Sequence, residues 1–275
     1  MPTIHLGPQD ALYYEYAAPT YSEGCTYVFF NPLTGDTSMW QAVIAPRLRQ
    51  SGHGTLLYNY RGQMNSPFAP GTKLDDKLIV ADVLRLLDEI KPARPVLTGL
   101  SIGGLFAACS WLSGAKAMGL ILINVLRRDG PRLKWISDAL IRCVEIGGMD
   151  LFRDVFTPLL FGEDWLNANR PNFFKSGPYN PIDKQSGHYN LIFHSKEADW
   201  DLPYEHLTLP TLVITGLQDR IFYDQKVLGD LFTRLPQARR IDFPDAGHLI
   251  PAERPEALAE ALLDFSRELT IGVSP

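Results

Sequence analysis

The chain has 275 residues, of which 45% are apolar and 21% are charged, and its formal net charge is −5. This composition is typical of a globular protein and excludes a disordered chain, which would be poorer in aromatic residues. The acidic balance also disfavours duplex nucleic acid as a partner, because proteins that bind it usually carry a basic surplus.

Short apolar runs typical of strands alternate with segments of helical periodicity along most of the chain. The predicted strands cover, in chain order, residues 3–6, 12–16, 26–30, 55–60, 95–100, 118–126, 211–216 and 240–243. The predicted helices cover residues 38–50, 74–90, 102–112, 133–146, 149–160 and 253–269. This alternation predicts an α/β fold in which helices cover both faces of a mostly parallel sheet. We expect the first two strands to form an antiparallel edge of that sheet.

The alternation of strand and helix fails between residues 129 and 205. Two helical stretches in this segment are followed by Pro, Gly and Asn residues that interrupt any regular pattern. We interpret 129–205 as a mostly helical insertion that lies over the C-terminal edge of the sheet. The predicted core then comprises residues 1–128 and 206–275, with 129–205 as a cap.

Residues 99–103 read GLSIG, a GxSxG motif, at the junction between a predicted strand and a predicted helix. A serine at such a turn has a strained conformation and an exposed hydroxyl above the sheet, where it can act as a nucleophile. The flanking Gly99 and Gly103 have to be small because they pack against each other. The alternative is that Ser101 only caps the helix, but a helix cap does not require glycine on both sides.

A serine nucleophile needs a base, and the chain contains six histidines. His248 follows the last predicted strand and precedes the last helix, so it lies at the C-terminal edge where sites in open α/β sheets are found. The alternative for His248 is a loop residue exposed to solvent. We expect His53 to end a helix. His188 and His194 lie in the insertion, and nothing in the sequence requires them at the site.

The base needs a carboxylate that orients it, and Asp219 follows a predicted strand at a turn. The chain order Ser101, Asp219, His248 is the order of nucleophile, acid and base in hydrolases that carry this serine motif. The competing carboxylates are Asp224, Asp242 and Asp245. We expect Asp224 to cap the next helix and Asp245 to shape the turn before the histidine.

With these motifs, essentially the whole chain resembles the α/β-hydrolase superfamily. The motifs that carry the resemblance read GLSIGG at 99–104, GLQD at 216–219, GH at 247–248 and IPAERPE at 250–256. The sequence YRGQMNS at 60–66 is similar to the family's RGxGxS loop, with Met64 in place of the usual glycine. Within the superfamily, the chain looks most like small esterases, enol-lactonases and cofactor-free haloperoxidase relatives. The resemblance implies that the insertion is the family's cap domain.

The resemblance also implies an oxyanion hole. The family usually has His-Gly after its third strand, followed by the residue whose N–H completes the hole. At that place this chain reads NPLTGD over residues 31–36. Aligning Asn31-Pro32 with His-Gly makes the N–H of Leu33 one donor, and the N–H of Ile102 is the implied second donor. Pro32 has no N–H and a fixed φ, so we expect a stiffer loop than is usual.

Three functions stay open on these grounds. The first is a serine hydrolase of a carboxylic ester or lactone that works through an acyl-enzyme, with Ser101, His248 and Asp219 as nucleophile, base and orienting acid. The second is C–C bond hydrolysis or acyl transfer on the same triad, although ring-cleavage C–C hydrolases usually carry Trp where this chain has Leu249. The third is a non-catalytic ligand receptor of the same fold, against which the intact triad argues.

The sequence does not name the substrate beyond a small, partly apolar molecule. The insertion is rich in apolar and aromatic residues, most of which we expect to pack the cap on the core and a few to line the pocket. Five arginines are candidates for binding a substrate carboxylate, although we expect most of them to be solvated. They are Arg127, Arg128, Arg142, Arg153 and Arg170.

No stretch of the sequence approaches the ~18 consecutive apolar residues that a membrane span needs. The N-terminal residues lack the basic and apolar regions of a signal peptide, so we expect a cytoplasmic protein. The three cysteines are far apart and predict neither a disulfide framework nor a metal site. The implied chemistry needs no cofactor and no metal, and the sequence leaves open whether the chain forms a homo-oligomer.

Overall fold

The computed structural model describes residues 2–174 and 177–271, and within them eight strands form one sheet in the order β1-β2-β4-β3-β5-β6-β7-β8. The strands are β1 (Thr3–His5), β2 (Ala11–Ala17), β3 (Thr26–Phe30), β4 (Gly54–Tyr58), β5 (Pro95–Leu100), β6 (Gly119–Ile123), β7 (Thr211–Gly216) and β8 (Ala238–Phe243). The pairs β1–β2 and β2–β4 are antiparallel, and every further pair along the sheet is parallel. The predicted α/β fold with an antiparallel edge is therefore confirmed.

Four strands of the sheet are buried along their whole length. Every residue of β3, β4, β6 and β7 is buried, as expected for a parallel sheet that helices cover on both faces. The bounds of β3, β5 and β7 are those predicted from their apolar runs. In contrast, β6 is shorter than predicted, because Asn124 adopts a left-handed backbone conformation (φ 51°) that ends the extended strand.

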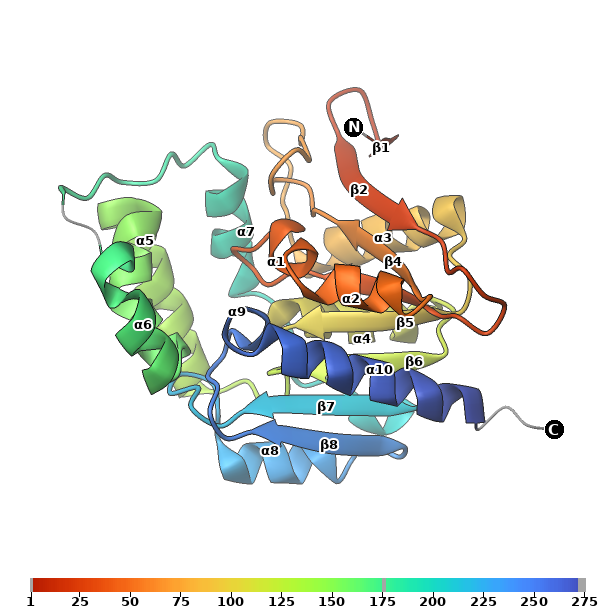
Figure 1. Ribbon diagram of the computed structural model, residues 1–275. Helices are drawn as coiled ribbons and strands as arrows, with labels where there is room; N and C mark the ends of the chain where they lie inside the picture. Colours follow the sequence, from red (N-terminus) through yellow and green to blue (C-terminus); the bar gives the residue numbers. More distant parts are fainter. Residues whose placement is uncertain (1, 175–176, 272–275) are drawn as a thin grey trace.

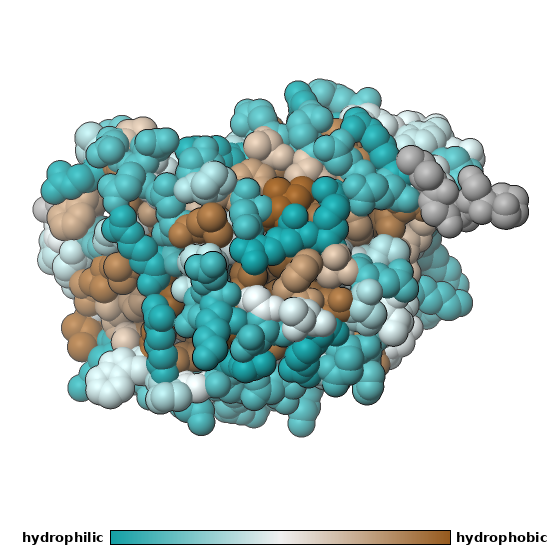
Figure 2. Space-filling model, turned by 90° about the horizontal axis from the view of Figure 1, so that it is seen from below, coloured by the Kyte–Doolittle hydropathy of each residue, from teal (hydrophilic) through white to brown (hydrophobic). Residues whose placement is uncertain are grey.

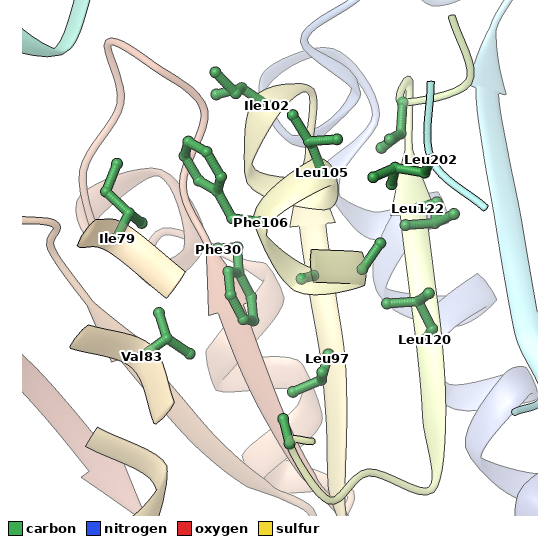
Figure 3. Packing of buried hydrophobic residues seen from close by; sticks show 14 of the residues in the cluster. Phe30, Ile79, Val83, Leu97, Ile102, Leu105, Phe106, Leu120, Leu122 and Leu202 are labelled. Atoms are coloured by element: carbon green, nitrogen blue, oxygen red, sulfur yellow. The ribbon is translucent and has the colours of Figure 1, made fainter. Parts of the chain in front are cut away.

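Helices cover both faces of the sheet (Figure 1). One face packs against α1 (Ser38–Gln41), α2 (Ile44–Gln50), α9 (Ile250–Glu253) and α10 (Pro255–Ile271). The other face packs against α3 (Asp76–Ile90), α4 (Ile102–Leu112) and α8 (Gln225–Phe232). Figure 3 shows part of this second layer, in which Val83 of α3 and Phe106 of α4 lie beside Phe30 of β3.

The single helix predicted at 38–50 is two short helices, α1 and α2. Pro46 lies in the first turn of α2, where its missing N–H removes no intrahelical hydrogen bond. In one continuous helix, the ring of Pro46 would clash with the carbonyl of Ala42. The C-terminal helix is divided in the same way, because α10 begins at Pro255 and the preceding residues form the separate helix α9.

Residues 129–205 leave the sheet after β6 and return to it at β7, and we refer to them as the inserted segment. They contain α5 (Pro131–Leu160), α6 (Glu163–Phe173) and α7 (Gly187–Ser195), and the short 3₁₀ helix η1 (Tyr204–His206) follows at their end. The arrows of β7 and β8 point toward α5 and α6 (Figure 1). The two predicted helices of this segment are joined in α5, with a break at Gly148 (φ 66°). An added Cβ at Gly148 would lie 2.3 Å from the carbonyl oxygen of Asn180.

Several large apolar side chains of α5 are exposed to solvent. They are Trp135, Ile146, Val155 and Leu159. Figure 2 shows apolar residues gathered on the side of the molecule where α5 and α6 lie in Figure 1. Among the residues that the structure describes, no helix combines the length and the apolar character needed to cross a lipid bilayer.

Candidate active site

Ser101 occupies the sharp turn between β5 and α4. Its φ of 56° and ψ of −127° lie in a region that residues other than glycine rarely adopt. An added Cβ on Gly99 would lie 2.4 Å from the backbone of Gly103, and one on Gly103 would lie 2.3 Å from the carbonyl oxygen of Phe30. The predicted requirement for small flanking residues is therefore confirmed. The Ser101 side chain makes no capping hydrogen bond to α4, so the alternative role as a helix cap is excluded.

The structure brings Asp219 and His248 together. Asp219 lies in the turn after β7 and His248 in the loop after β8, and Asp219 Oδ2 is 2.6 Å from His248 Nδ1. The other carboxylate oxygen, Oδ1, accepts hydrogen bonds from the N–H groups of Ile221 and Phe222 at 3.0 and 2.9 Å. Burial by itself raises the pKa of the Asp219 carboxyl, but the interaction with His248, a backbone hydrogen bond from Phe222 and the positive charge of Arg127 together bring the pKa below its ordinary value. The carboxylate is therefore ionised and can accept the Nδ1 proton in a hydrogen bond.

The competing carboxylates are engaged elsewhere. Asp224 caps α8 by accepting hydrogen bonds from two N–H groups in the first turn of that helix, which confirms the prediction. Asp242 forms an ion pair with Arg240. Asp245, which precedes α9, forms one with Arg254, which follows that helix. These interactions leave the carboxylate after β7 as the partner of the histidine.

Sequence reasoning missed Asn124, which joins the two loops that carry Asp219 and His248. Its side-chain oxygen accepts a hydrogen bond from the Gly216 N–H at 2.8 Å, at the end of β7. Its amide group donates to the carbonyl oxygens of Gly247 and His248 at 3.2 and 2.9 Å. A single side chain therefore fixes both loops. The available signal was an asparagine at the end of a buried run, since Asn adopts left-handed conformations more readily than most residues.

The inserted segment is also hydrogen-bonded to these two loops. The carbonyl oxygen of Leu160, in the last turn of α5, accepts a hydrogen bond from the N–H of His248. The carbonyl oxygen of Leu159 accepts one from the N–H of Arg220. The end of α5 is thus part of the framework that positions the loops of Asp219 and His248.

The loop after β3 is held by a buried network around Asn31. Asn31 Nδ2 lies within hydrogen-bond distance of the carbonyl oxygen of Tyr58 (2.9 Å), Asn59 Oδ1 (3.0 Å) and Gln63 Oε1 (3.1 Å). Asn31 Oδ1 accepts a hydrogen bond from Trp40 Nε1 at 2.9 Å. This network restrains the residues that immediately precede Leu33.

Leu33 and Ile102, the two residues implied as oxyanion donors, lie on opposite sides of Ser101 in the chain but line the same cavity. Among the described residues, neither of their backbone N–H groups has a hydrogen-bond acceptor. Two unpaired backbone N–H groups beside one cavity are available as hydrogen-bond donors to a ligand there.

A cavity of about 220 Å³ lies where these elements meet, and both Ser101 and His248 line it, whereas Asp219 does not reach it. Most of the other lining side chains are apolar and come from the core and from the inserted segment. They include Leu33, Met39, Ile102, Leu140, Phe152 and Trp200. Ligand pockets commonly measure roughly 300–1,000 Å³, so this cavity suits a small molecule.

In the described structure, no hydrogen bond joins Ser101 to His248. Ser101 Oγ instead accepts a hydrogen bond from Arg127 Nη2 at 3.3 Å. The Arg127 guanidinium lies 4.2 Å from the ring centroid of Trp200 and 4.1 Å from that of Phe222. Burial lowers the pKa of Arg127 to about 10, which still leaves the side chain positively charged at neutral pH.

Arg127 therefore differs from the other candidate arginines, because only 6% of its surface is exposed. The others are exposed or partly exposed, as expected, and they are Arg128, Arg142, Arg153 and Arg170. Arg127 is buried by two aromatic rings that are distant from it in the sequence, and local sequence patterns give no sign of such contacts.

The other histidines considered above lie away from the cavity. His53 is buried between α2 and β4, where its Nδ1 accepts a hydrogen bond from the N–H of Cys25. Neither His188 nor His194 of α7 lines the cavity. Over residues 2–174 and 177–271, no group of His, Cys, Asp and Glu side chains is placed to hold a metal ion.

Known proteins resemble this chain over most of its length. A model of the alpha/beta hydrolase family matches residues 27–261. The 3-oxoadipate enol-lactonase 1 of Acinetobacter baylyi is 26% identical over 247 residues, which cover 88% of this chain and 88% of that protein.

Two solved structures illustrate the similarity in fold. The enol-lactonase from Burkholderia xenovorans LB400 is 24% identical, with a TM-score of 0.75 over 96% of this chain and 99% of its own. A thermophilic esterase from Thermogutta terrifontis is 22% identical, with a TM-score of 0.77 over 98% of this chain and 97% of its own.

Proposed function

Because this chain belongs to the alpha/beta hydrolase family, we propose that it is a serine hydrolase that cleaves a small carboxylic ester or lactone. The observation that carries this proposal is the hydrogen bond between Asp219 and His248 beside a cavity that His248 shares with Ser101. Two enol-lactonases and an esterase among the similar proteins support the same class of bond.

In the proposed reaction, Ser101 Oγ attacks the carbonyl carbon of the substrate, and His248 Nε2 takes the proton of the hydroxyl group. The hydrogen bond from His248 Nδ1 to Asp219 fixes the tautomer in which Nε2 is free to act as the base. For this step, the Ser101 hydroxyl has to donate its hydrogen toward His248 Nε2, and the contact from Arg127 does not block this because Oγ only accepts in it. Catalytic hydrogen bonds often tighten only when the substrate is bound.

The backbone N–H groups of Leu33 and Ile102 would stabilise the negative oxygen of the tetrahedral intermediate. Ile102 is the first residue of α4, so the partial positive charge of the helix N-terminus adds to this stabilisation. The network around Asn31 supports the proposal, because restrained donors need little reorganisation when the charge develops.

Collapse of the intermediate breaks the bond to the alcohol oxygen, which receives the proton from His248. The alcohol of an ester then leaves, whereas the hydroxyl formed from a lactone stays attached to the acyl group. A water molecule that gives its proton to His248 attacks the acyl-enzyme. This second half of the reaction releases a carboxylic acid and restores the Ser101 hydroxyl.

We further propose that the inserted segment, residues 129–205, is a cap that selects the substrate, and that residues 1–128 and 206–275 carry the chemistry. The support for this division is that α5 contributes several side chains to the cavity wall. They include Leu133, Ile136, Leu140, Phe152 and Leu160. The proposed triad and both proposed oxyanion donors come from outside the inserted segment.

The test is hydrolysis of para-nitrophenyl butyrate by the wild-type protein and by Ser101→Ala. We expect Ser101→Ala to lower kcat by a factor on the order of 10⁶, because the nucleophile is lost. Ser113→Ala, at the exposed C-terminal end of the same helix, is the matched control and should keep its activity. A fluorophosphonate reagent should modify the wild-type protein at Ser101, as identified by peptide mass spectrometry. Near-normal turnover by Ser101→Ala, or modification of a different serine, would refute the proposal.

A further inference from the structure

Arg127 is the only permanently charged residue among the described residues that line the cavity. Apart from His248, the rest of the wall consists of apolar side chains, small residues and neutral hydroxyl groups. A buried guanidinium lowers the stability of a protein unless its charge is compensated. The contacts of the Arg127 guanidinium therefore have to show how its buried charge is compensated.

The chain compensates this charge only in part. Arg127 donates hydrogen bonds to two carbonyl oxygens just after β6, at 2.6 and 3.4 Å, and to Ser101 Oγ at 3.3 Å. The rings of Trp200 and Phe222 add cation–π contacts. Within the described residues, Nη1 has no hydrogen-bond acceptor and no carboxylate forms an ion pair with the guanidinium. The Asp219 carboxylate acts on Arg127 only through space and is itself hydrogen-bonded to the histidine.

We propose that Arg127 binds a carboxylate in the acyl part of the substrate, an inference that rests on the proposed ester or lactone hydrolysis. A carboxylate is the planar, bidentate partner that a guanidinium prefers and that this cavity does not supply. The preferred ester substrates are then monoesters of short dicarboxylic acids. The apolar wall contacts the remainder of the molecule.

The position of the guanidinium limits the length of the acyl chain. A reacting carbonyl has to approach Ser101 Oγ to about 3–3.5 Å, and Arg127 Nη2 lies 3.3 Å from the same oxygen. A carboxylate separated from the ester carbonyl by one or two carbons therefore reaches Arg127. A longer chain has to fold back within a cavity of about 220 Å³. Because the acyl group stays on Ser101 after the alcohol leaves, Arg127 retains the carboxylate through both halves of the reaction.

Carboxylate binding also changes the surroundings of the nucleophile. In the structure, a cationic donor is hydrogen-bonded to Ser101 Oγ, and this contact withdraws electron density from the oxygen that has to attack. When a substrate carboxylate takes the N–H groups of Arg127, this contact is exchanged and the electron density on Ser101 Oγ is no longer withdrawn. The carboxylate is therefore expected to raise kcat as well as lower KM.

The experiment compares monoethyl succinate with ethyl isocaproate, in which two methyl groups replace the carboxylate oxygens. Release of ethanol is measured for both esters with the wild-type protein. We expect a kcat/KM for monoethyl succinate that is roughly 10- to 100-fold higher, the range for a hydrogen-bonded charged pair. Monoethyl malonate should likewise exceed its neutral isostere ethyl isovalerate, whereas monoethyl adipate should be a poorer substrate than monoethyl succinate.

Variants of two neighbouring arginines test whether Arg127 is the source of the preference for monoethyl succinate. Arg127→Gln should abolish the preference for monoethyl succinate, and Arg127→Lys should keep part of it, because lysine retains the charge but not the bidentate geometry. Arg128→Gln removes the same charge from an exposed neighbour that does not line the cavity, so it should leave the ratio unchanged. If Arg127→Gln does not fold, the test rests on the ratio of kcat/KM for monoethyl succinate to that for ethyl isocaproate. This ratio is then compared between the wild-type protein and Arg127→Lys.

A wild-type kcat/KM for monoethyl succinate that is equal to or lower than that for ethyl isocaproate would overturn this inference and leave Ser101-dependent ester hydrolysis intact. A preference that survives in Arg127→Gln would also overturn it and assign Arg127 a structural role. If no ester is cleaved, the proposed function is refuted. Binding of succinate then tests separately whether Arg127 binds a carboxylate. A rise in Tm with succinate that Arg127→Gln abolishes would support the carboxylate site, and an unchanged Tm would contradict it.

Discussion

The sheet and the inserted segment differ in how completely they are buried. Every residue of β3, β4, β6 and β7 is buried between two layers of helices. In contrast, no side chain of α6 is buried, and Trp135 of α5 is 80% exposed. A close-packed residue cannot be substituted without disturbing its neighbours, whereas a residue on a half-exposed helix can be substituted at little cost. The difference suggests that the core fixes the geometry of the reacting groups and that a more tolerant region shapes the cavity.

The largest expected effect comes from Asp219, a residue outside the inserted segment that we propose takes part in the reaction. Asp219→Asn should lower kcat by roughly 10⁴, because the histidine loses the carboxylate that holds its tautomer. Asp224→Asn is the matched control, since Asp224 follows the same strand but caps α8. Steady-state kinetics on para-nitrophenyl butyrate measure both variants. A larger defect in Asp224→Asn would mean that the acid has been assigned to the wrong carboxylate.

The second prediction concerns the stability of the two regions. Leu122→Ala in β6 removes a side chain that is fully buried, and it should lower the free energy of unfolding by about 2–5 kcal/mol. Leu159→Ala makes the same chemical change at a side chain of α5 that is 38% exposed, and its effect should stay below about 1 kcal/mol. Urea unfolding monitored by circular dichroism measures both. Similar losses in the two variants would show that the inserted segment is packed as tightly as the sheet.

The third prediction concerns substrate choice and has the smallest expected effect. Leu140→Ala enlarges the cavity from the α5 side, so it should favour longer acyl esters over butyrate. The ratio of their kcat/KM values should change by about 10- to 200-fold, which corresponds to about 1–3 kcal/mol of discrimination. Ile146→Ala is the control on the same helix, because Ile146 is 59% exposed and does not line the cavity. A uniform loss of activity on every ester in Leu140→Ala would contradict a role in selection alone.

The sheet could be predicted closely from the sequence because its signal is local. Runs of mostly apolar and β-branched residues predicted the bounds of β3, β5 and β7, and the GxSxG motif predicted Ser101 at the turn where the structure has it. The pairing of Asp219 with His248 followed from the order of motifs along the chain, and the structure places these two side chains in contact.

The remaining features depend on contacts between distant residues. Nothing near Arg127 in the sequence indicates that Trp200 and Phe222 will bury it, so it could not be separated from the solvated arginines. The bonds by which Asn124 joins the acid and base loops are likewise invisible before the strands are placed side by side. The break between α1 and α2 could have been predicted, since Pro46 was present in the sequence as the physical cause.

The hydrogen bonds at the end of α5 constrain how this enzyme could be re-engineered by grafting. The carbonyl oxygens of Leu159 and Leu160 accept hydrogen bonds from Arg220 and His248. A transplanted segment whose long helix ended one turn earlier would leave these two N–H groups without their acceptors, and the loss at the buried residue His248 would be about 1–3 kcal/mol. A chimaera should therefore retain the last turn of α5 from the recipient and exchange only the residues on either side. Splicing at residues 129 and 205 alone would transfer a new cavity wall but remove the acceptor that holds the backbone of His248.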